Sequence, residues 1–340
     1  MDKLRILHVS PEVGPFARTG GMADVVWALS KELKRELGHD VRVIMPKYKL
    51  PGQQEAFESI KELGSLRVLL GEDVEHVHIE EGRPKEIDIP LYLIHDKNYL
   101  YRDRLYGYLD DAERFILFCR ATLEMLKRLN WMPDVIHCHD WTTGLIPGYK
   151  KLIPEYRELF DSLAIVYTIH NIQHQGSYPL EVFDLAGLSD QKWPISAYWH
   201  YERFCFKKGA LFFADLITTV SETYAQEIQE SEIDGVEFGY GLEGVLKSRR
   251  DFLQGIVNGI DYEKWNPDGD KYIQKYYETK DGEKLKRRKK APHFSVKDIP
   301  VGLGTTCHGK SKLRAELESI CRWTPDPETM IIGRIGRICA

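Results

Sequence analysis

Short apolar runs alternate along this sequence with longer segments whose apolar residues recur at helical spacing. The run Leu4–Val9 has the length of a buried strand, Ala23–Leu37 repeats with the period of a helix, and Val41–Met45 is apolar again. This alternation is typical of βαβ units, in which the strands pair in parallel and helices cover the sheet. The pattern therefore predicts an α/β fold built on a doubly wound parallel sheet.

The same patterns predict further elements along the chain. Residues 61–95 alternate between polar and apolar positions, which indicates strands of a hairpin. Ser221 is a good helix N-cap and follows an apolar run directly. Strands are predicted at Val135–His139, Ala164–Ile169, Leu216–Val220 and Gln254–Val257, and helices at Ala112–Leu129 and Tyr201–Phe213.

The character of the sequence changes after Pro267. Residues 268–328 are charged, contain few long apolar runs and are interrupted by Pro292, Pro300 and Pro325. The apolar run Met330–Gly333 then has the character of a new strand. We therefore expect a domain at 1–267, a charged connector at 268–328, and the first strand of another domain at 329–340.

Composition and charge exclude several classes of protein. The net charge of −5 disfavours a general nucleic-acid binder, because such proteins present a basic surface to the phosphates. No segment approaches the roughly 18 consecutive apolar residues that a membrane span needs, and the chain starts directly with a strand pattern rather than a signal peptide. The six cysteines are scattered without a CxxC pair, which indicates reduced thiols. We expect a cytoplasmic protein.

Polar and glycine-rich clusters follow several of the predicted strands. In a doubly wound sheet, ligands bind beyond the carboxyl ends of the strands. Because these clusters all fall at such ends, we expect them to share one site. They are Gly14–Asp24, His139-Asp140-Trp141, His170-Asn171, Ser221-Glu222 and Asn258-Gly259.

The segment Arg18-Thr19-Gly20-Gly21 lies just before a predicted helix. Glycines there let the backbone approach a phosphate, and the free amides and dipole of the helix attract the anion. Paired glycines also simply turn a chain, and spacing alone leaves both interpretations open. The segment is neither a GxGxxG fingerprint nor a P-loop, which disfavours a dinucleotide dehydrogenase or an NTPase.

Histidines recur near the predicted site. His137 and His139 alternate along one strand and therefore face the same side, and His170 and His174 follow one βα unit later. Such a group can indicate a metal-dependent hydrolase that uses His137 and His139. The carboxylate partners of such a centre are not evident, so we expect no metal and interpret His137 and His174 as structural.

Aromatic residues also lie near the predicted strand ends. Trp141, Tyr178, Trp199 and Tyr240 have faces that suit a sugar ring, and each could equally be packed in the core.

Taken in order, these motifs resemble those of the glycogen synthases and bacterial-type starch synthases. Ser10–Val25 is similar to the family signature that usually reads Lys-Thr-Gly-Gly-Leu-Ala-Asp-Val, with arginine here in place of the lysine. The resemblance covers residues 1 to about 267 closely and the remainder loosely. Further matches are His137–Trp141, Thr168–Asn171 with Gln175-Gly176, Thr219–Ala225, Gly239–Gly244 and Gly255–Asp261.

The resemblance implies a GT-B type glycosyltransferase, in which two Rossmann-like domains face each other across a cleft. This chain would hold the amino-terminal, acceptor-side half. The implied reaction transfers glucose, with retention and without a metal or other cofactor, from ADP-glucose or UDP-glucose to the non-reducing end of an α-1,4-glucan, as in glycogen synthesis. The implied partners are a nucleotide sugar and an α-glucan. The resemblance leaves open whether the chain forms a homo-oligomer.

The resemblance also implies roles for individual residues. Arg18 would neutralise the donor diphosphate while Gly20 and Gly21 bring the backbone close to it. The implied catalytic residues are His170, which would bind the transferred glucose and help to stabilise the transition state, and Asp140 on the acceptor side, and neither would be a general base. Further substrate-binding positions implied by the family are Asp24, His139, Trp141, Asn171, Tyr240, Asn258 and Gly259.

The sequence departs from the family after the connector. The family places its nucleotide pocket in a carboxyl-terminal domain, of which only the apparent first strand, Met330–Gly336, is present. We therefore expect little or no synthase activity from this chain alone. A non-catalytic glucan-binding domain and the metal-dependent hydrolase are the alternatives.

Overall fold

A nine-stranded β-sheet forms the centre of the protein in a computed structural model that describes residues 2–188, 195–259 and 261. All neighbouring strands from β14 to β5 pair in parallel, and β4 and β3 are antiparallel at one edge. Across the sheet the strands are β14 (Leu253–Gly255), β11 (Leu216–Thr219), β7 (Ala164–Ile169), β6 (Val135–His139), β1 (Arg5–Val9), β2 (Asp40–Pro46), β5 (Leu91–His95), β4 (Asp73–Pro84) and β3 (Phe57–Leu70).

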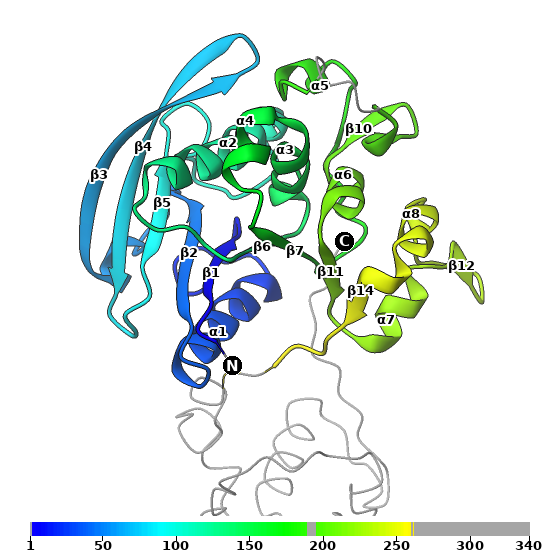
Figure 1. Cartoon of the computed structure of the whole chain (residues 1–340), viewed down its shortest axis with the longest axis horizontal. Helices are drawn as coiled ribbons and strands as arrows, with labels where there is room; N and C mark the ends of the chain where they lie inside the picture. Colours follow the sequence, from blue (N-terminus) through cyan, green and yellow to red (C-terminus); the bar gives the residue numbers. More distant parts are fainter. Residues whose placement is uncertain (1, 189–194, 260, 262–340) are drawn as a thin grey trace, which may run out of the picture. The chain divides into compact units, whose positions relative to one another are not determined.

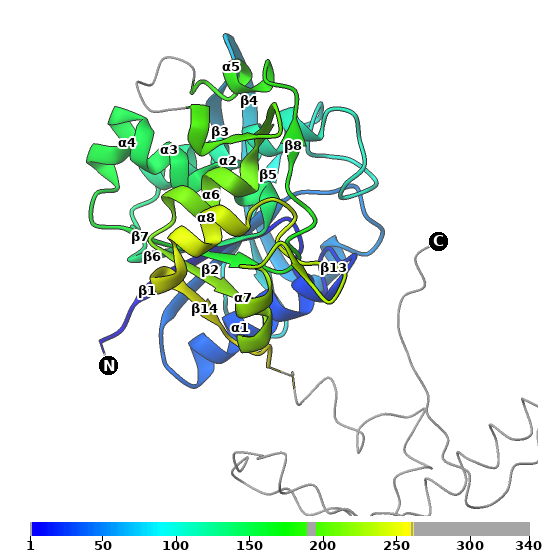
Figure 2. The same ribbon diagram turned by 90° about the vertical axis from the view of Figure 1, so that its right-hand side faces the viewer.

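Helices cover both faces of this sheet, as Figure 1 and, after a quarter turn, Figure 2 show. Adjacent residues of β2 separate the two faces: Val43 and Met45 join the apolar cluster that contains Val26 and Trp27 of α1, whereas Ile44 joins the cluster around α2. The doubly wound α/β fold predicted from the sequence is confirmed. The helices are α1 (Gly21–Arg35), α2 (Asp111–Arg128), α3 (Ile146–Leu152), α4 (Pro154–Leu159), α5 (Val182–Leu185), α6 (Phe206–Phe213), α7 (Glu222–Glu227) and α8 (Glu243–Ser248).

The strand order reverses between β1 and β6. After β1 the chain adds β2 and β5 on one side, whereas β6, β7, β11 and β14 extend the sheet on the other side. Crossovers that leave in opposite directions open a crevice beyond the carboxyl ends of the two strands at this point. In β1 and β6 these ends are Val9 and His139, and Val9 pairs with Cys138.

Small sheets and 3₁₀ turns lie outside the main sheet. The sheet formed by β8, β10 and β9 connects the segment after β7 with the start of α6. These short elements are β8 (Ser177–Tyr178), β9 (Trp199–His200), β10 (Arg203–Cys205), β12 (Glu232–Ile233), β13 (Val236–Glu237), and the 3₁₀ turns η1 (Gln54–Ala56), η2 (Trp141–Thr143), η3 (Ile195–Ala197) and η4 (Arg250–Phe252).

Two predicted elements have different bounds in the structure. The helix expected at Tyr201–Phe213 begins only at Phe206, because Arg203–Cys205 pairs with Ser177–Tyr178 and with Trp199–His200 as a strand. The strand expected at Gln254–Val257 is Leu253–Gly255 instead, and Val257 is 71% exposed. Ser221 caps α7 as predicted, since its Oγ accepts a 2.9 Å hydrogen bond from the Tyr224 amide.

The described residues up to Gly259 form one compact unit. The connector at 268–328 and the strand at 329–340 lie outside the described residues. Cys119, Cys138 and Cys205 are buried free thiols. None of the helices in the described part of the chain is both long enough and apolar enough for a membrane crossing.

Candidate functional site

Three of the predicted site residues contact one another beyond the carboxyl ends of β6 and β7. His139 ends β6, Asp140 follows it, and His170 follows β7. Nδ1 of His139 lies 3.0 Å from Nε2 of His170. Oδ1 of Asp140 accepts a hydrogen bond from the His170 backbone amide at 3.2 Å. Parallel pairing of β6 with β7 thus unites two motifs that are about one βα unit apart in the sequence.

Asp140 is held by a lysine that the sequence reasoning missed. Nζ of Lys207, on α6, lies 2.9 Å from Asp140 Oδ1 and donates to the Asn171 carbonyl at 2.5 Å. The Lys207 side chain is fully buried and that of Asp140 is nearly so. A buried charge has to be paired, so the two residues depend on each other. The only hint in the sequence was that Lys207 lies in the otherwise apolar segment of α6. Because Lys208 lies in the same segment, the sequence could not show which lysine is buried.

The backbone of Asp140 is unusual as well. Its φ of 57° and ψ of −175° lie in a region that residues other than glycine rarely adopt, at a cost of about 1–3 kcal/mol. Its amide nevertheless donates to the Thr168 carbonyl at 3.0 Å, and its carbonyl accepts from the Thr143 amide at 3.1 Å. These contacts and the Lys207 ion pair hold the strained turn in place.

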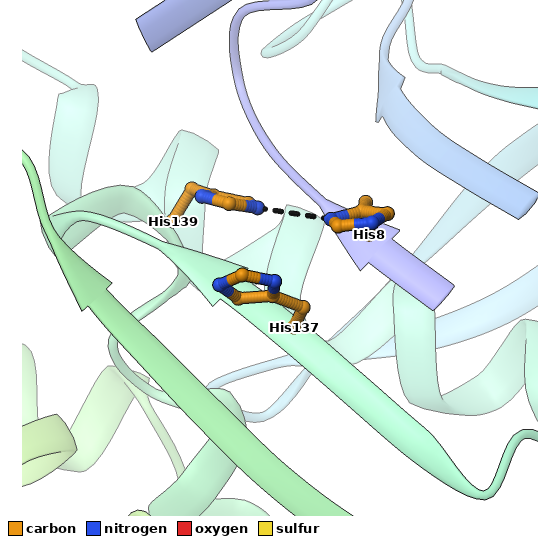
Figure 3. Close-up of side chains that lie close together, drawn as sticks. All are labelled: His8, His137 and His139. Atoms are coloured by element: carbon orange, nitrogen blue, oxygen red, sulfur yellow. Dashed lines mark hydrogen bonds between the residues drawn. The ribbon is translucent and has the colours of Figure 1, made fainter. Parts of the chain in front are cut away.

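A packed group of three histidines lies at the centre of the sheet, and Figure 3 shows its members His8, His137 and His139. Nδ1 of His8 lies 3.2 Å from Nε2 of His139, and the ring centroids of His137 and His139 are 4.1 Å apart. Burial lowers the pKa of His8 to about 4 and lowers the pKa of His137 and His139 well below its ordinary value. Burial also lowers the pKa of His170, which the charge of Asp140 opposes. All four imidazoles are therefore neutral at pH 7.

The contacts of these histidines favour a hydrogen-bonded group over a metal centre. The nitrogens of His8, His137 and His139 lie within 4.8 Å of one another, but zinc requires all of its ligand nitrogens at about 2.0–2.1 Å from one point. The His137 ring instead packs against that of His139 at an interplanar angle of 30°, and its Nε2 lies 2.6 Å from the Thr168 hydroxyl. The geometry favours structural roles for these rings over the metal-dependent hydrolase.

The glycine loop follows β1 and leads into α1. The carboxylate of Glu12 accepts hydrogen bonds from the amides of Thr19 and Gly20, at 2.7 and 2.9 Å, and from the Thr19 and Tyr106 hydroxyls at 2.6 and 2.9 Å. Glu12 therefore organises the loop, a role that the sequence did not reveal. Because Glu12 follows β1 and His170 follows β7 in the parallel part of the sheet, the loop lies at the same carboxyl edge of the sheet as His170.

The loop leaves space at its two glycines. A β-carbon on Gly20 or Gly21 would meet no heavy atom within 4 Å, so packing within the protein does not require glycine there. The open side at the start of α1 is suited to an anion, because the first amides of a helix have no partner within it. Arg18 forms a 2.8 Å ion pair with Asp24, and its side chain is 49% exposed.

The remaining predicted residues differ in their surroundings. The Tyr240 carbonyl accepts from Gln175 Nε2 at 2.9 Å, and the Tyr240 hydroxyl contacts Gln173, so Tyr240 lies against the loop after β7. Trp141 is half-buried, with its ring edge-on to Phe115 at 4.9 Å. The carbonyl of Asn171 is occupied by Lys207. Asn258 and Gly259 are exposed beyond β14, at the far edge of the sheet.

Comparison with known proteins shows the family of this chain. A family model described as the starch synthase catalytic domain matches residues 5–248. The glycogen synthases of Moorella thermoacetica and Desulforudis audaxviator are each 40% identical to the chain over 88% of its length. The chain spans 60% of the length of both relatives.

A solved structure supports the same assignment. The catalytic domain of starch synthase IV from Arabidopsis thaliana, bound to ADP and acarbose, superposes with a TM-score of 0.71 and 32% identity. The match covers 80% of this chain and 55% of that one. The chain therefore belongs to the starch synthase catalytic domain family.

Proposed function

We propose that this chain forms the acceptor-side wall of a cleft in which glucose passes from a nucleotide sugar to the end of an α-1,4-glucan. One observation carries the proposal: a neutral, half-buried His170 is held by His139 and Asp140 one strand from the reversal point of the sheet, at the same carboxyl edge as an open glycine loop. An imidazole suits a sugar hydroxyl, and a helix start suits a diphosphate. ADP-glucose and UDP-glucose are the candidate donors.

In this proposal Arg18 exchanges its partner when the donor binds. The guanidinium pairs with Asp24 and is half-exposed, so it can turn towards a diphosphate without leaving a buried charge behind. Arginine binds phosphate oxygens through two parallel hydrogen bonds, and the start of α1 would contribute amides and dipole. Asp24 would then stay near the first turn of α1, where a negative charge is favourable.

We propose that the transfer proceeds with retention and without Asp140 as a nucleophile or general base. A carboxylate nucleophile or general base needs a lone pair directed at the substrate. Oδ1 of Asp140 already accepts from Lys207 and from the His170 amide, so this oxygen is engaged within the protein rather than directed at a substrate. We therefore assign Asp140 a positioning role, with the leaving phosphate of the donor taking the proton of the acceptor.

The proposal is tested by calorimetric titration of the 340-residue chain with ADP-glucose, UDP-glucose and maltoheptaose. Binding is the primary readout because the matched relatives are longer than this chain. Arg18→Ala should weaken nucleotide-sugar binding about tenfold or more and leave maltoheptaose binding unchanged. The matched control is Arg5→Ala, which removes an exposed arginine that pairs with Asp134 at the amino end of β1.

Two other outcomes of the titration would contradict parts of the proposal. Binding of maltoheptaose without any affinity for either nucleotide sugar would support a glucan-binding domain and overturn the proposed transfer. Equal losses in Arg18→Ala and Arg5→Ala would remove Arg18 from the donor site. Assay of glucose transfer to glycogen by the same chain measures how much of the reaction residues 1–340 support.

A further inference from the structure

A row of three imidazoles leads from the interior of the sheet to the candidate site. His8 on β1 contacts His139 at the end of β6 through Nδ1 and Nε2, at 3.2 Å. His139 in turn contacts His170 after β7 through Nδ1 and Nε2, at 3.0 Å. His137 packs against His139 but forms its hydrogen bond with the Thr168 hydroxyl, so it is not part of the row.

Each member of the row can donate once and accept once. A neutral imidazole carries one N–H and one nitrogen lone pair, and burial keeps these rings neutral by lowering their pKa. A hydrogen bond between two such rings therefore needs the proton on one nitrogen and its absence from the other. Consequently the row can be ordered in only two ways, with every ring donating towards His170 or every ring donating towards His8.

The inner end of the row decides between the two orders. Nε2 of His8 is buried and has no hydrogen-bond partner in the described part of the chain. A buried N–H without an acceptor is rarer in proteins than an unused acceptor, because the donor loses its bond to water outright. His8 therefore carries its proton on Nδ1 and donates to His139. His139 must then donate from Nδ1 to Nε2 of His170.

The outer end of the row follows from this order. His170 accepts at Nε2, so its own proton is on Nδ1. Nδ1 of His170 has no hydrogen-bond partner among residues 2–188, 195–259 and 261, and the ring is only partly covered. The Nδ1–H group is thus left as a donor on the side of the candidate site.

We propose that His8 and His139 are positioning residues that fix His170 as the Nδ1–H tautomer, so that His170 donates a hydrogen bond to a hydroxyl oxygen of the bound sugar. Only the identity of the ligand rests on the proposed function. The tautomer itself follows from contacts within this chain. His8 would act on the site through two hydrogen bonds without touching a substrate.

The tautomer is measured directly by long-range ¹H–¹⁵N correlation spectra of the 340-residue chain with ¹⁵N-labelled histidine. Protonated and unprotonated ring nitrogens have well separated ¹⁵N shifts, and the His170 signals are identified by their loss in His170→Asn. We expect Nδ1 of His170 to be protonated and Nε2 to be unprotonated at pH 7. A His170 ring with its proton on Nε2, or with protons on both nitrogens, would overturn the proposal in the unmodified chain.

Two substitutions at His8 test the relay. His8→Phe removes the donor, so His170 should change from one tautomer to a mixture of two. His8→Asn places an amide N–H near the position of Nδ1 and should restore the single tautomer. His137→Asn, in the same cluster but outside the row, should leave the His170 signals in place. An unchanged tautomer in folded His8→Phe would contradict the relay, as would an equal change in His137→Asn.

These outcomes are separate from those of the proposed function. The expected tautomer with no affinity for ADP-glucose or maltoheptaose would leave the relay intact and remove its sugar ligand. Sugar binding together with the wrong tautomer would keep the function and eliminate the relay.

Discussion

Lys207 and Asp140 form an ion pair inside the protein, with 2.9 Å between Nζ and Oδ1. Lys207→Met should leave the Asp140 carboxylate buried without a counter-charge and lower the free energy of unfolding by about 3–5 kcal/mol. Urea denaturation measures this loss. Lys208→Met is the matched control, because Lys208 is only partly buried and should cost far less.

A double substitution separates charge from packing at this pair. Asp140→Asn added to Lys207→Met removes the unpaired charge, so part of the lost stability should return. If the double variant is no more stable than Lys207→Met alone, the loss arises from packing rather than from the buried charge.

Glu12 should control the order of the glycine loop. Glu12→Gln replaces the charged oxygen Oε2, which accepts both the Thr19 and the Gly20 amide, by a neutral and weaker acceptor, and places an NH₂ group where Oε1 accepts two hydroxyls. We expect hydrogen exchange at these two amides to accelerate, and a stability loss of about 1–3 kcal/mol. Glu32→Gln, on the exposed side of α1, should leave the exchange rates of the loop unchanged. Slow exchange at Gly20 in Glu12→Gln would argue against this role.

Stability should fall in mild acid because of His8. Burial lowers the pKa of His8 to about 4 in the folded protein, whereas a histidine in an unfolded chain has a pKa of about 6.5. Its contribution is fully present above pH 6.5, because neither state is protonated there. As the pH falls from 6.5 to 4 the unfolded state binds the proton first, and roughly 3 kcal/mol is lost.

The pH effect is checked by urea denaturation at pH 7 and pH 5. The slope of unfolding free energy against pH should be smaller in His8→Asn than in the unmodified chain. The difference should be up to about 1.4 kcal/mol per pH unit, which corresponds to the uptake of one proton on unfolding. Identical slopes in the two proteins would mean that His8 does not have the low pKa.

Gly176 should resist substitution because Trp141 lies against it. A β-carbon there would approach the Trp141 ring to 2.5 Å, and the backbone has a φ of +62°. Gly176→Ala should therefore destabilise the protein by about 1–3 kcal/mol and shift the tryptophan fluorescence. Gly38→Ala is the control, since Gly38 has a similar φ of +70° but free space around it. Equal losses in both variants would show that backbone strain alone is responsible.

The sheet and the meeting of the strand ends were predictable from the sequence, and the contacts that hold the site were not. Val135–His139 and Ala164–Ile169 are short, mostly apolar runs, and parallel pairing then brings Asp140 and His170 together. Helical spacing after Tyr201 could not reveal that Arg203–Cys205 pairs with Ser177–Tyr178, because the partner strand is distant in the sequence.

Lys207 and Glu12 illustrate the same limit for side chains. A lysine on a short helix and a glutamate after a strand usually face water, so residue type alone does not mark them as buried partners. Their roles depend on groups that only the fold brings near, Asp140 for Lys207 and the Thr19 and Gly20 amides for Glu12.

The positive φ of Asp140 separates two parts of the motif His137–Trp141 in space. It ends β6 abruptly, so that η2 starts at the next residue and the Trp141 ring turns towards Phe115 while His139 faces His170. Replacing Asp140 by alanine would therefore disturb the tryptophan as well as the charge, and the two effects would be measured as one. Asparagine keeps the shape of the aspartate side chain and removes only its charge, which makes Asp140→Asn the informative probe of the carboxylate.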